Sequence, residues 1–358
     1  MIPNQKQDDS RRITPTSIRI LRVVFLTLIV LGVGIFLSFS RRSHPSDTIS
    51  AAQRSTASAS NSNKSGPEIA GCPIFPADNV WNTPITKLGK DPNSATYIAT
   101  IGPELKLHPD FGFNEQTGIP FTIIRSNVKS VKVTFEYRDD SDLANYPLSF
   151  DEKIEGGPDS TGDRHILLVD RDRCLLEEVF AVEPQSDGSW KAGSGIKMDL
   201  TSNALRGDGK TSADAAGLPI VPGLVRYDEV ASGEIRHALR FTVPKTQRAY
   251  VWPARHFASK ITDPKYPPMG LRFRLRADFD ISGFSKSNQV ILTALKRYGM
   301  FLADNGGAWF LSGAPDEHWN DDDLHNLNKV TGKDFEVVDE SDWQMMTDSA
   351  RVDPMSLK

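Results

Sequence analysis

The longest apolar stretch of the chain lies close to its start. Residues 20–39 carry no charge except Arg22, and about twenty such residues can cross the hydrocarbon core of a bilayer. Basic residues dominate before this stretch, which favours an N-terminus in the cytoplasm. We therefore expect a basic cytoplasmic tail over residues 1–19 and a transmembrane signal anchor over residues 20–40. A cleaved signal peptide is the alternative, but its apolar region is usually shorter, ~7–15 residues, and no clear cleavage site follows.

The composition changes abruptly after the predicted anchor. Eight of the 23 residues from 43 to 65 are Ser, and such a segment buries too little apolar area to offset its ordering entropy. We expect a disordered linker over residues 41–66, an extracytoplasmic domain over residues 67–345 and a C-terminal tail over residues 346–358. The expected localisation is a single-pass membrane protein whose large domain lies outside, in the periplasm or the extracellular space.

Within the predicted domain, apolar and polar residues alternate in several stretches. The clearest are Lys129–Tyr137, Ile235–Val243 and Leu271–Ala277, and this period of two is typical of half-buried antiparallel strands. Shorter candidate strands, separated by Gly, Pro and Asp, are His165–Asp170, Leu175–Val182, Ala249–Trp252 and Phe335–Val338. The pattern predicts a mainly β fold, an antiparallel β-sandwich or a jelly-roll-like core.

Few segments favour a helix. Apolar residues recur at helical spacing over Ser287–Asp304, and Asn305, Gly306 and Gly307 follow as a stop signal. A shorter helix is expected to begin in the acidic run Asp321–Asp323, because Asp suits a helix N-terminus. One or two helices are therefore expected beside the strands.

The charge distribution excludes two classes of partner. Residues 1–65 hold nine basic and three acidic residues, so the rest of the chain, with 33 basic and 43 acidic residues, has a net charge of −10. A nucleic-acid partner is not expected, because phosphate binding needs clustered positive charge. Residues 204–211 resemble a phosphate-binding loop, but Gly217 and Pro219 interrupt the helix that should follow. No nucleotide is therefore expected.

No cofactor is strongly implied by the sequence. Calcium is possible, because carboxylates gather between Asp316 and Asp323, although their spacing is not that of an EF-hand loop. Histidines from separate strands would suit zinc if they converged, but no pair has a recognisable metal-ligand spacing. We therefore predict no metal site.

Cys72 and Cys174 are the two cysteines of the chain. Outside the cytoplasm an even pair suggests a disulfide, and two buried free thiols are the alternative. A disulfide here would close a loop of about a hundred residues, a stabilisation of ~4–5 kcal/mol in the chain-entropy model. It would attach the start of the domain to a central strand.

Several stretches of the domain resemble a group of secreted bacterial proteins of unknown function. The stretches are Cys72–Trp81 (CPIFPADNVW), Ala213–Glu229 (ADAAGLPIVPGLVRYDE), Gly233–Leu239 (GEIRHAL) and Ala303–Ser312. The similarity covers about residues 70–340. It implies an extracytoplasmic domain, and it carries no activity or catalytic residue to this chain.

Four residues are candidates for acid–base catalysis. His165 opens a strand after a Gly-rich turn and His256 follows another strand, and imidazole exchanges protons near neutral pH. Glu178 and its neighbour Glu177 lie in an apolar strand and point to opposite faces, so one of them is a candidate for a buried acid. Asp214 lies among small residues, which permit a close approach of a ligand. The alternatives are a turn cap, a satisfied core hydrogen bond or a solvated edge strand.

Four further residues are candidates for substrate binding. Trp252 and Arg255 lie just before His256, and an aromatic ring, a cation and an imidazole would suit a sugar subsite. Tyr227 beside an arginine would suit β-elimination from a uronic acid, where the cation offsets developing charge. His237 lies on the apolar face of its strand, where a core histidine is the commoner reading.

These observations favour an extracytoplasmic domain that acts on polysaccharide. Two carboxyl groups would serve hydrolysis of a glycosidic bond, and a histidine or tyrosine base would serve a lyase; the sequence does not choose between them. Trp190, Trp252 and Trp309 are candidate stacking platforms for sugars. The alternatives are a non-catalytic glycan- or envelope-binding module and a structural protein of the envelope.

Overall fold

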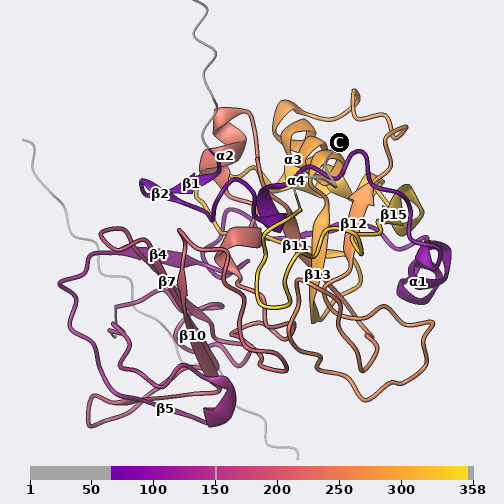
Figure 1. Cartoon of the computed structure of the whole chain (residues 1–358). Helices are drawn as coiled ribbons and strands as arrows, with labels where there is room; N and C mark the ends of the chain where they lie inside the picture. Colours follow the sequence, from indigo (N-terminus) through magenta and orange to yellow (C-terminus); the bar gives the residue numbers. More distant parts are fainter. Residues whose placement is uncertain (1–65, 150, 354–358) are drawn as a thin grey trace, which may run out of the picture. The chain divides into compact units, whose positions relative to one another are not determined.

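The computed structural model describes residues 66–149 and 151–353 (Figure 1). The predicted cytoplasmic tail, the anchor and all of the linker before residue 66 lie outside the described residues. Within them, no helix has the length and apolar character needed to cross a bilayer.

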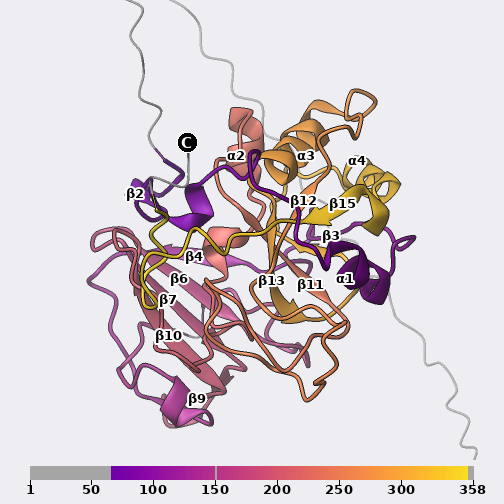
Figure 2. The same ribbon diagram turned by 45° about the vertical axis from the view of Figure 1, so that its right-hand side comes forward.

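The described domain is built mostly from strands, which confirms the prediction of a mainly β fold. Its two larger sheets have the strand orders β10-β7-β6-β4 and β15-β12-β13-β11-β14-β3, and two smaller sheets are β5-β9-β8 and β1-β2 (Figures 1 and 2). The strand bounds are β1 Glu68–Ile69, β2 Cys72–Pro73, β3 His108–Asp110, β4 Phe121–Ile124, β5 Val133–Phe135, β6 Ile166–Asp170, β7 Leu175–Phe180, β8 Glu183–Pro184, β9 Trp190–Ala192, β10 Ser194–Asp199, β11 Leu239–Val243, β12 Arg272–Leu275, β13 Met300–Asn305, β14 Phe310–Ser312 and β15 Phe335–Val337.

Strand pairing is mixed, whereas the alternating pattern predicted antiparallel strands. The pairs β4–β6, β11–β13, β14–β3 and β5–β9 are parallel. Strand β6 shows why: Leu167 and Val169 pack in one core, and Ile166 and Leu168 pack in a second core. A strand covered on both faces reads as a continuous apolar run.

The helices are short. Their bounds are α1 Ser94–Ile101, α2 Tyr227–Ser232, α3 Lys286–Arg297 and α4 Asp321–Leu324, and short 3₁₀ helices lie at Val80–Asn82, Arg138–Asp140, Val221–Gly223, His325–Lys329 and Gly332–Asp334. Helix α3 packs against β12 and α2. The predicted short helix at Asp321–Asp323 is therefore present as α4.

The longest predicted helix, Ser287–Asp304, is wrong in its second half. Helix α3 ends at Arg297, and the chain continues from Met300 as β13. Gly299 has a φ of +69° and donates its N–H to the carbonyl oxygen of Ala294 at 3.0 Å. This left-handed glycine ends the helix and turns the chain into the sheet.

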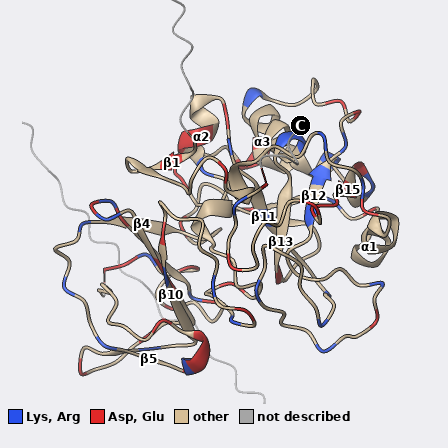
Figure 3. Cartoon of the chain, in the orientation of Figure 1, with Lys and Arg blue, Asp and Glu red and all other residues tan. Residues whose placement is uncertain are grey.

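Two predicted strands also differ in the structure. Ala249–Trp252 forms only an isolated bridge between Tyr250 and Met269. Leu271–Ala277 contains β12, but its polar face is solvated only toward its end, because Arg272 is fully buried, Arg274 is half-buried and Arg276 is exposed. The Arg272 guanidinium donates to Glu340 Oε1 at 2.8 Å and to backbone carbonyl oxygens, and Figure 3 shows the basic residues along β12.

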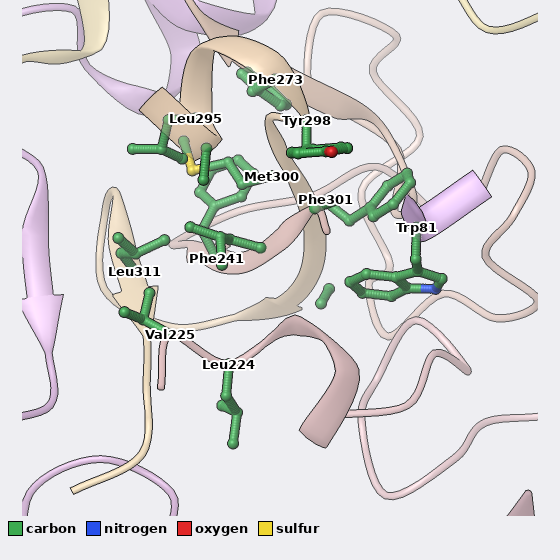
Figure 4. Packing of buried hydrophobic residues seen from close by; sticks show 14 of the residues in the cluster. Trp81, Leu224, Val225, Phe241, Phe273, Leu295, Tyr298, Met300, Phe301 and Leu311 are labelled. Atoms are coloured by element: carbon green, nitrogen blue, oxygen red, sulfur yellow. The ribbon is translucent and has the colours of Figure 1, made fainter. Parts of the chain in front are cut away.

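The main core lies around the six-stranded sheet. Trp81 lies against Phe301, with ring centroids 4.8 Å apart, and Phe241 stacks on Trp309 at 5.7 Å. Figure 4 shows Trp81, Phe241 and Phe301 pointing into one cluster. The start of the domain is thus part of the core of its later half.

Both ends of the domain are bonded to the rest of its structure. A disulfide joins Cys72 to Cys174, in the turn between β6 and β7. Near the other end Ala350 and Val352 are buried, and Val80 donates its N–H to the Ala350 carbonyl at 2.8 Å. The folded domain therefore continues beyond residue 345, where we expected a tail to begin.

Candidate active site

An open pocket of about 440 Å³ lies where the ends of β7, β10 and β13 approach the loop before Pro222. Four aspartates line it, together with one histidine and one exposed tyrosine. They are Asp140, Asp163, Asp214, Asp304, His256 and Tyr137. Among the described residues that line the pocket, none is Lys or Arg, so its charge is acidic.

Three consecutive residues, Ala213–Ala215, organise this pocket. The carbonyl oxygen of Ala213 accepts a hydrogen bond from His165 Nε2 at 2.9 Å, and the carbonyl oxygen of Ala215 accepts one from His256 Nδ1 at 2.9 Å. Asp214 lies between these two anchors and contributes its side chain. The loop rich in small residues thus brings together three of the four predicted catalytic residues.

The Asp214 carboxylate is held by a buried arginine. Arg240, from β11, donates Nε–H to Oδ2 and Nη2–H to Oδ1 of Asp214, each at 2.9 Å. Its remaining Nη1 donates to Ser312 Oγ at 2.6 Å. Both side chains of the ion pair are almost fully buried. A bidentate pair of this kind fixes the orientation of the carboxylate as well as its position.

Asp304, at the end of β13, is the second carboxyl group of the pocket, and it is half-buried. Burial raises the pKa of Asp304 to about 8, and the nearby Asp214 carboxylate adds to this effect, against the opposing charge of Arg240. Asp304 is therefore protonated at neutral pH, whereas Asp214 forms an ion pair. The two carboxyl groups hold different protonation states because their surroundings differ.

His256 presents one free ring nitrogen. A carbonyl oxygen can only accept, so the ring must carry its proton on Nδ1, which donates to Ala215. Among the described residues Nε2 has no hydrogen-bond partner. In the neutral ring this nitrogen has a lone pair and can accept a proton. Its place in the pocket suits a general base.

His165 is more enclosed than His256. Its Nδ1 lies 2.6 Å from Glu155 Oε2, and only 4% of its side chain is exposed. Burial alone would lower the pKa of His165, but the hydrogen bond and charge of Glu155 raise it to about 9. The same contact holds the pKa of Glu155 below its usual value against the effect of burial. His165 is thus engaged at both nitrogens behind the pocket wall.

Both adjacent glutamates of β7 are fully buried, so neither is solvated at an edge. Strand β7 is central, paired with both β6 and β10. Glu178 accepts the backbone N–H groups of Ile220 and Val221 at 2.9 Å, and burial raises its pKa to about 7 despite these bonds. Glu177 pairs with Lys197 on the opposite face. Glu178 supports the loop beyond Asp214 from inside the protein.

The four predicted substrate-binding residues do not line this pocket. His237 makes its hydrogen bonds within the core. Its Nδ1 donates to the Ala238 carbonyl oxygen, and its Nε2 lies 2.9 Å from Glu229 Oε2. Tyr227 stacks with His318, and Trp252 lines a different pocket and donates to the Ser349 carbonyl. Arg255 precedes His256 but directs its guanidinium to Asp208 and to backbone carbonyl oxygens. Trp190 and Trp309, the other candidate platforms, are also buried.

Carboxylates of the acidic run between Asp316 and Asp323, where calcium was considered, accept hydrogen bonds from neighbouring loops. Asp321 Oδ1 accepts the Phe113 N–H at 2.8 Å, and Asp323 Oδ2 accepts from Ser285 at 2.6 Å. These contacts join α4 to neighbouring loops.

Sequence reasoning missed Asp304, Arg240 and Glu155. Asp304 fell in the second half of the predicted helix and was not expected at the end of a strand, and Arg240 fell on the polar face of an alternating strand and was not expected to be buried. Glu155 opens the Gly-rich turn before His165. A turn of this kind can fold back on itself, so the sequence did indicate that the Glu155 carboxylate could reach His165, ten residues later.

Comparison with protein-family models, with curated proteins and with solved structures finds no match for this chain.

Proposed function

We propose that the domain hydrolyses a neutral polysaccharide, from a position anchored in the membrane and outside the cytoplasm. The observation that carries the proposal is one open pocket that holds a protonated carboxyl group, Asp304, beside an ion-paired one, Asp214. Glycosidic bond cleavage needs one group that gives a proton and another that activates the attacking group. The predicted anchor and the resemblance to secreted proteins support the location.

The residues have distinct roles in this proposal. Asp304 donates its proton to the leaving glycosidic oxygen, because it is the group protonated at neutral pH. His256 Nε2 takes a proton from the water that attacks the anomeric carbon. Asp214 is a positioning residue, since its charge keeps Asp304 protonated and Arg240 fixes its orientation. Tyr137, with 47% of its surface exposed, offers a face on which a sugar ring can stack.

The charge of the pocket favours hydrolysis of a neutral glycan over β-elimination from a uronic acid. A lyase needs a cation to offset the charge on the substrate carboxylate. The pocket has four aspartates, and the described residues that line it include no Lys or Arg. Asp304 is protonated and Asp214 is paired with Arg240, so the carboxylates of Asp140 and Asp163 are the like charges that a polyuronate would meet there.

The test is an assay of the full chain on neutral and acidic polysaccharides. Reducing ends report hydrolysis, and ultraviolet absorbance of an unsaturated uronate reports a lyase. We expect reducing ends from a neutral glycan, with D304N and H256Q each lowering the rate at least ~100-fold, a typical contribution of general acid–base catalysis. D263N, at an aspartate that does not line the pocket, is the matched control and should leave the rate unchanged. Glycan binding without any product would instead support the binding-module alternative.

A further inference from the structure

A second cluster behind the pocket wall, formed by Glu155, Asp163 and His165, has the composition of a metal site. One ligand atom from each residue lies within 4.8 Å of the others. The imidazole is buried, Glu155 is partly buried and Asp163 is exposed and lines the pocket. The cluster therefore has one open side, which faces the site described above.

The hydrogen bonds of His165 point to a positive species between its ring and Glu155. The Ala213 carbonyl can only accept, so Nε2 of His165 carries a proton. In the neutral ring Nδ1 then has a lone pair directed at Glu155 Oε2, 2.6 Å away. Two lone pairs at this distance repel each other. The space holds either a proton shared by Nδ1 and Oε2, carried by the ring or by the carboxyl group, or a metal cation after the two atoms have separated slightly.

Asp163 distinguishes these two occupants. A proton there is hydrogen-bonded by two atoms, Nδ1 and a Glu155 oxygen, and Asp163 acts on it only through its charge. A divalent cation takes three protein ligands and leaves an open position for water. Asp163 supplies that third ligand atom from the open side. A metal-bound histidine also commonly donates its other ring N–H to a backbone carbonyl, as Nε2 does to Ala213.

The loop that carries Glu155 and Asp163 is held in place by Arg164. Its Nη1 donates to the carbonyl oxygens of Pro158 and Ser160 at 2.7 and 2.9 Å, and its Nε donates to that of Val182 at 2.9 Å. The position of the loop is therefore fixed, whereas the ligand atoms still have to shift to coordinate a metal. In a tetrahedral site ligand atoms are about 3.4 Å apart, so Glu155 and His165 need to separate by less than about 1 Å.

We infer that Glu155, Asp163 and His165 bind a divalent transition-metal cation such as Zn²⁺, with its open coordination position toward the pocket. The inference does not depend on the proposed hydrolysis, because metal binding is measured without a substrate. Zinc fits one imidazole and two carboxylates.

The test is zinc binding to the full chain after treatment with a chelator and its removal. Calorimetric titration at neutral pH should show one equivalent of Zn²⁺. D163N should weaken binding at least ~10-fold and H165Q ~100-fold or more, and Co²⁺ should give visible absorption bands that H165Q removes. Asp163 is exposed, so D163N keeps the fold even if H165Q does not.

A surface pair gives a matched control. His318 Nδ1 lies 2.6 Å from Asp316 Oδ1, the same distance as between His165 and Glu155, but the described residues place no third ligand beside this pair. H318Q should leave zinc binding unchanged. Absence of stoichiometric binding, or binding that is lost with H318Q and kept with D163N, would overturn the inference and leave a protonated His165 in its place.

Discussion

At the scale of single residues, the pocket separates two like groups by their surroundings. Asp214 is paired with the Arg240 guanidinium from β11. For Asp304, burial and the nearby charge of Asp214 raise the pKa. A carboxyl group kept neutral beside a charged one is a common arrangement in acid–base enzymes.

The first prediction concerns the pH dependence of activity. Asp304 has a pKa raised to about 8, so its proton is present below that pH and is lost above it. Hydrolysis should therefore persist through neutral pH and fall as the pH rises through about 8. Initial rates measured across a pH series show this fall in rate on the alkaline side. A rate that stays constant well above pH 8 would remove Asp304 from the role of acid.

The second prediction concerns the buried ion pair. R240M leaves the Asp214 carboxylate buried without its partner, which should lower the free energy of unfolding by ~3–5 kcal/mol. Denaturant unfolding measures the change. R276M removes an arginine from an exposed pair with Asp278 and should leave the unfolding midpoint unchanged. Equal effects of the two substitutions would contradict the special position of Arg240.

At the scale of elements, Gly299 decides where helix gives way to strand. Its φ of +69° suits glycine, and a Cβ there would collide with the Phe273 carbonyl oxygen. Gly233 ends α2 with a φ of +90°, but a Cβ there would meet nothing within 4 Å. At both positions an alanine would adopt an unfavourable positive φ, but only at residue 299 would its Cβ also collide with a neighbouring atom.

The third prediction uses this difference. G299A should destabilise the domain by several kcal/mol, because strain and collision add. G233A carries only the strain of a left-handed alanine, ~1–2 kcal/mol. Thermal and denaturant unfolding of both variants provide the comparison. Similar losses would show that the chain relaxes freely around residue 299.

The elements that were predictable are those in which local pattern and burial agree. Strands at 166–170, 175–180 and 335–337 could be located because their apolar runs are bounded by turn residues. The helix over Ser287–Asp304 was too long because Met300, Phe301 and Leu302 are apolar in either structure, and only tertiary packing decides between them.

The site was predictable in part for the same reason. Asp214, His165 and His256 were identified from their neighbours along the chain. Asp304 and Arg240 both interact with Asp214, which is 90 residues from Asp304 and 26 residues from Arg240 in the sequence. No local pattern shows that residues so far apart lie together. Tyr227 and His237 carried the right chemistry, but the fold places them elsewhere.

At the scale of the whole molecule, one covalent bond links the start of the domain to its four-stranded sheet. Cys72 and Cys174 are 102 residues apart in the sequence. The disulfide therefore restricts the unfolded chain over about a third of the domain. This is the largest entropic constraint that the described residues show.

The fourth prediction follows from that constraint. The double variant C72A/C174A should lose ~4–5 kcal/mol of unfolding free energy in the chain-entropy model, and reduction of the wild-type chain should give the same denaturant midpoint. Adding reductant to the double variant is the control and should change nothing. An unaltered midpoint after reduction would show that core packing alone sets the stability.

The bonds between the two ends of the domain set the order in which it can be completed. Val80 bonds to Ala350 and Asp78 bonds to Val352, so a segment near the start of the domain waits for one that is synthesised about 270 residues later. Contacts so distant in sequence slow folding. Until residue 352 emerges, the partly made domain must expose the apolar surface that its closing segment covers, and it depends on its cellular environment for protection over that interval.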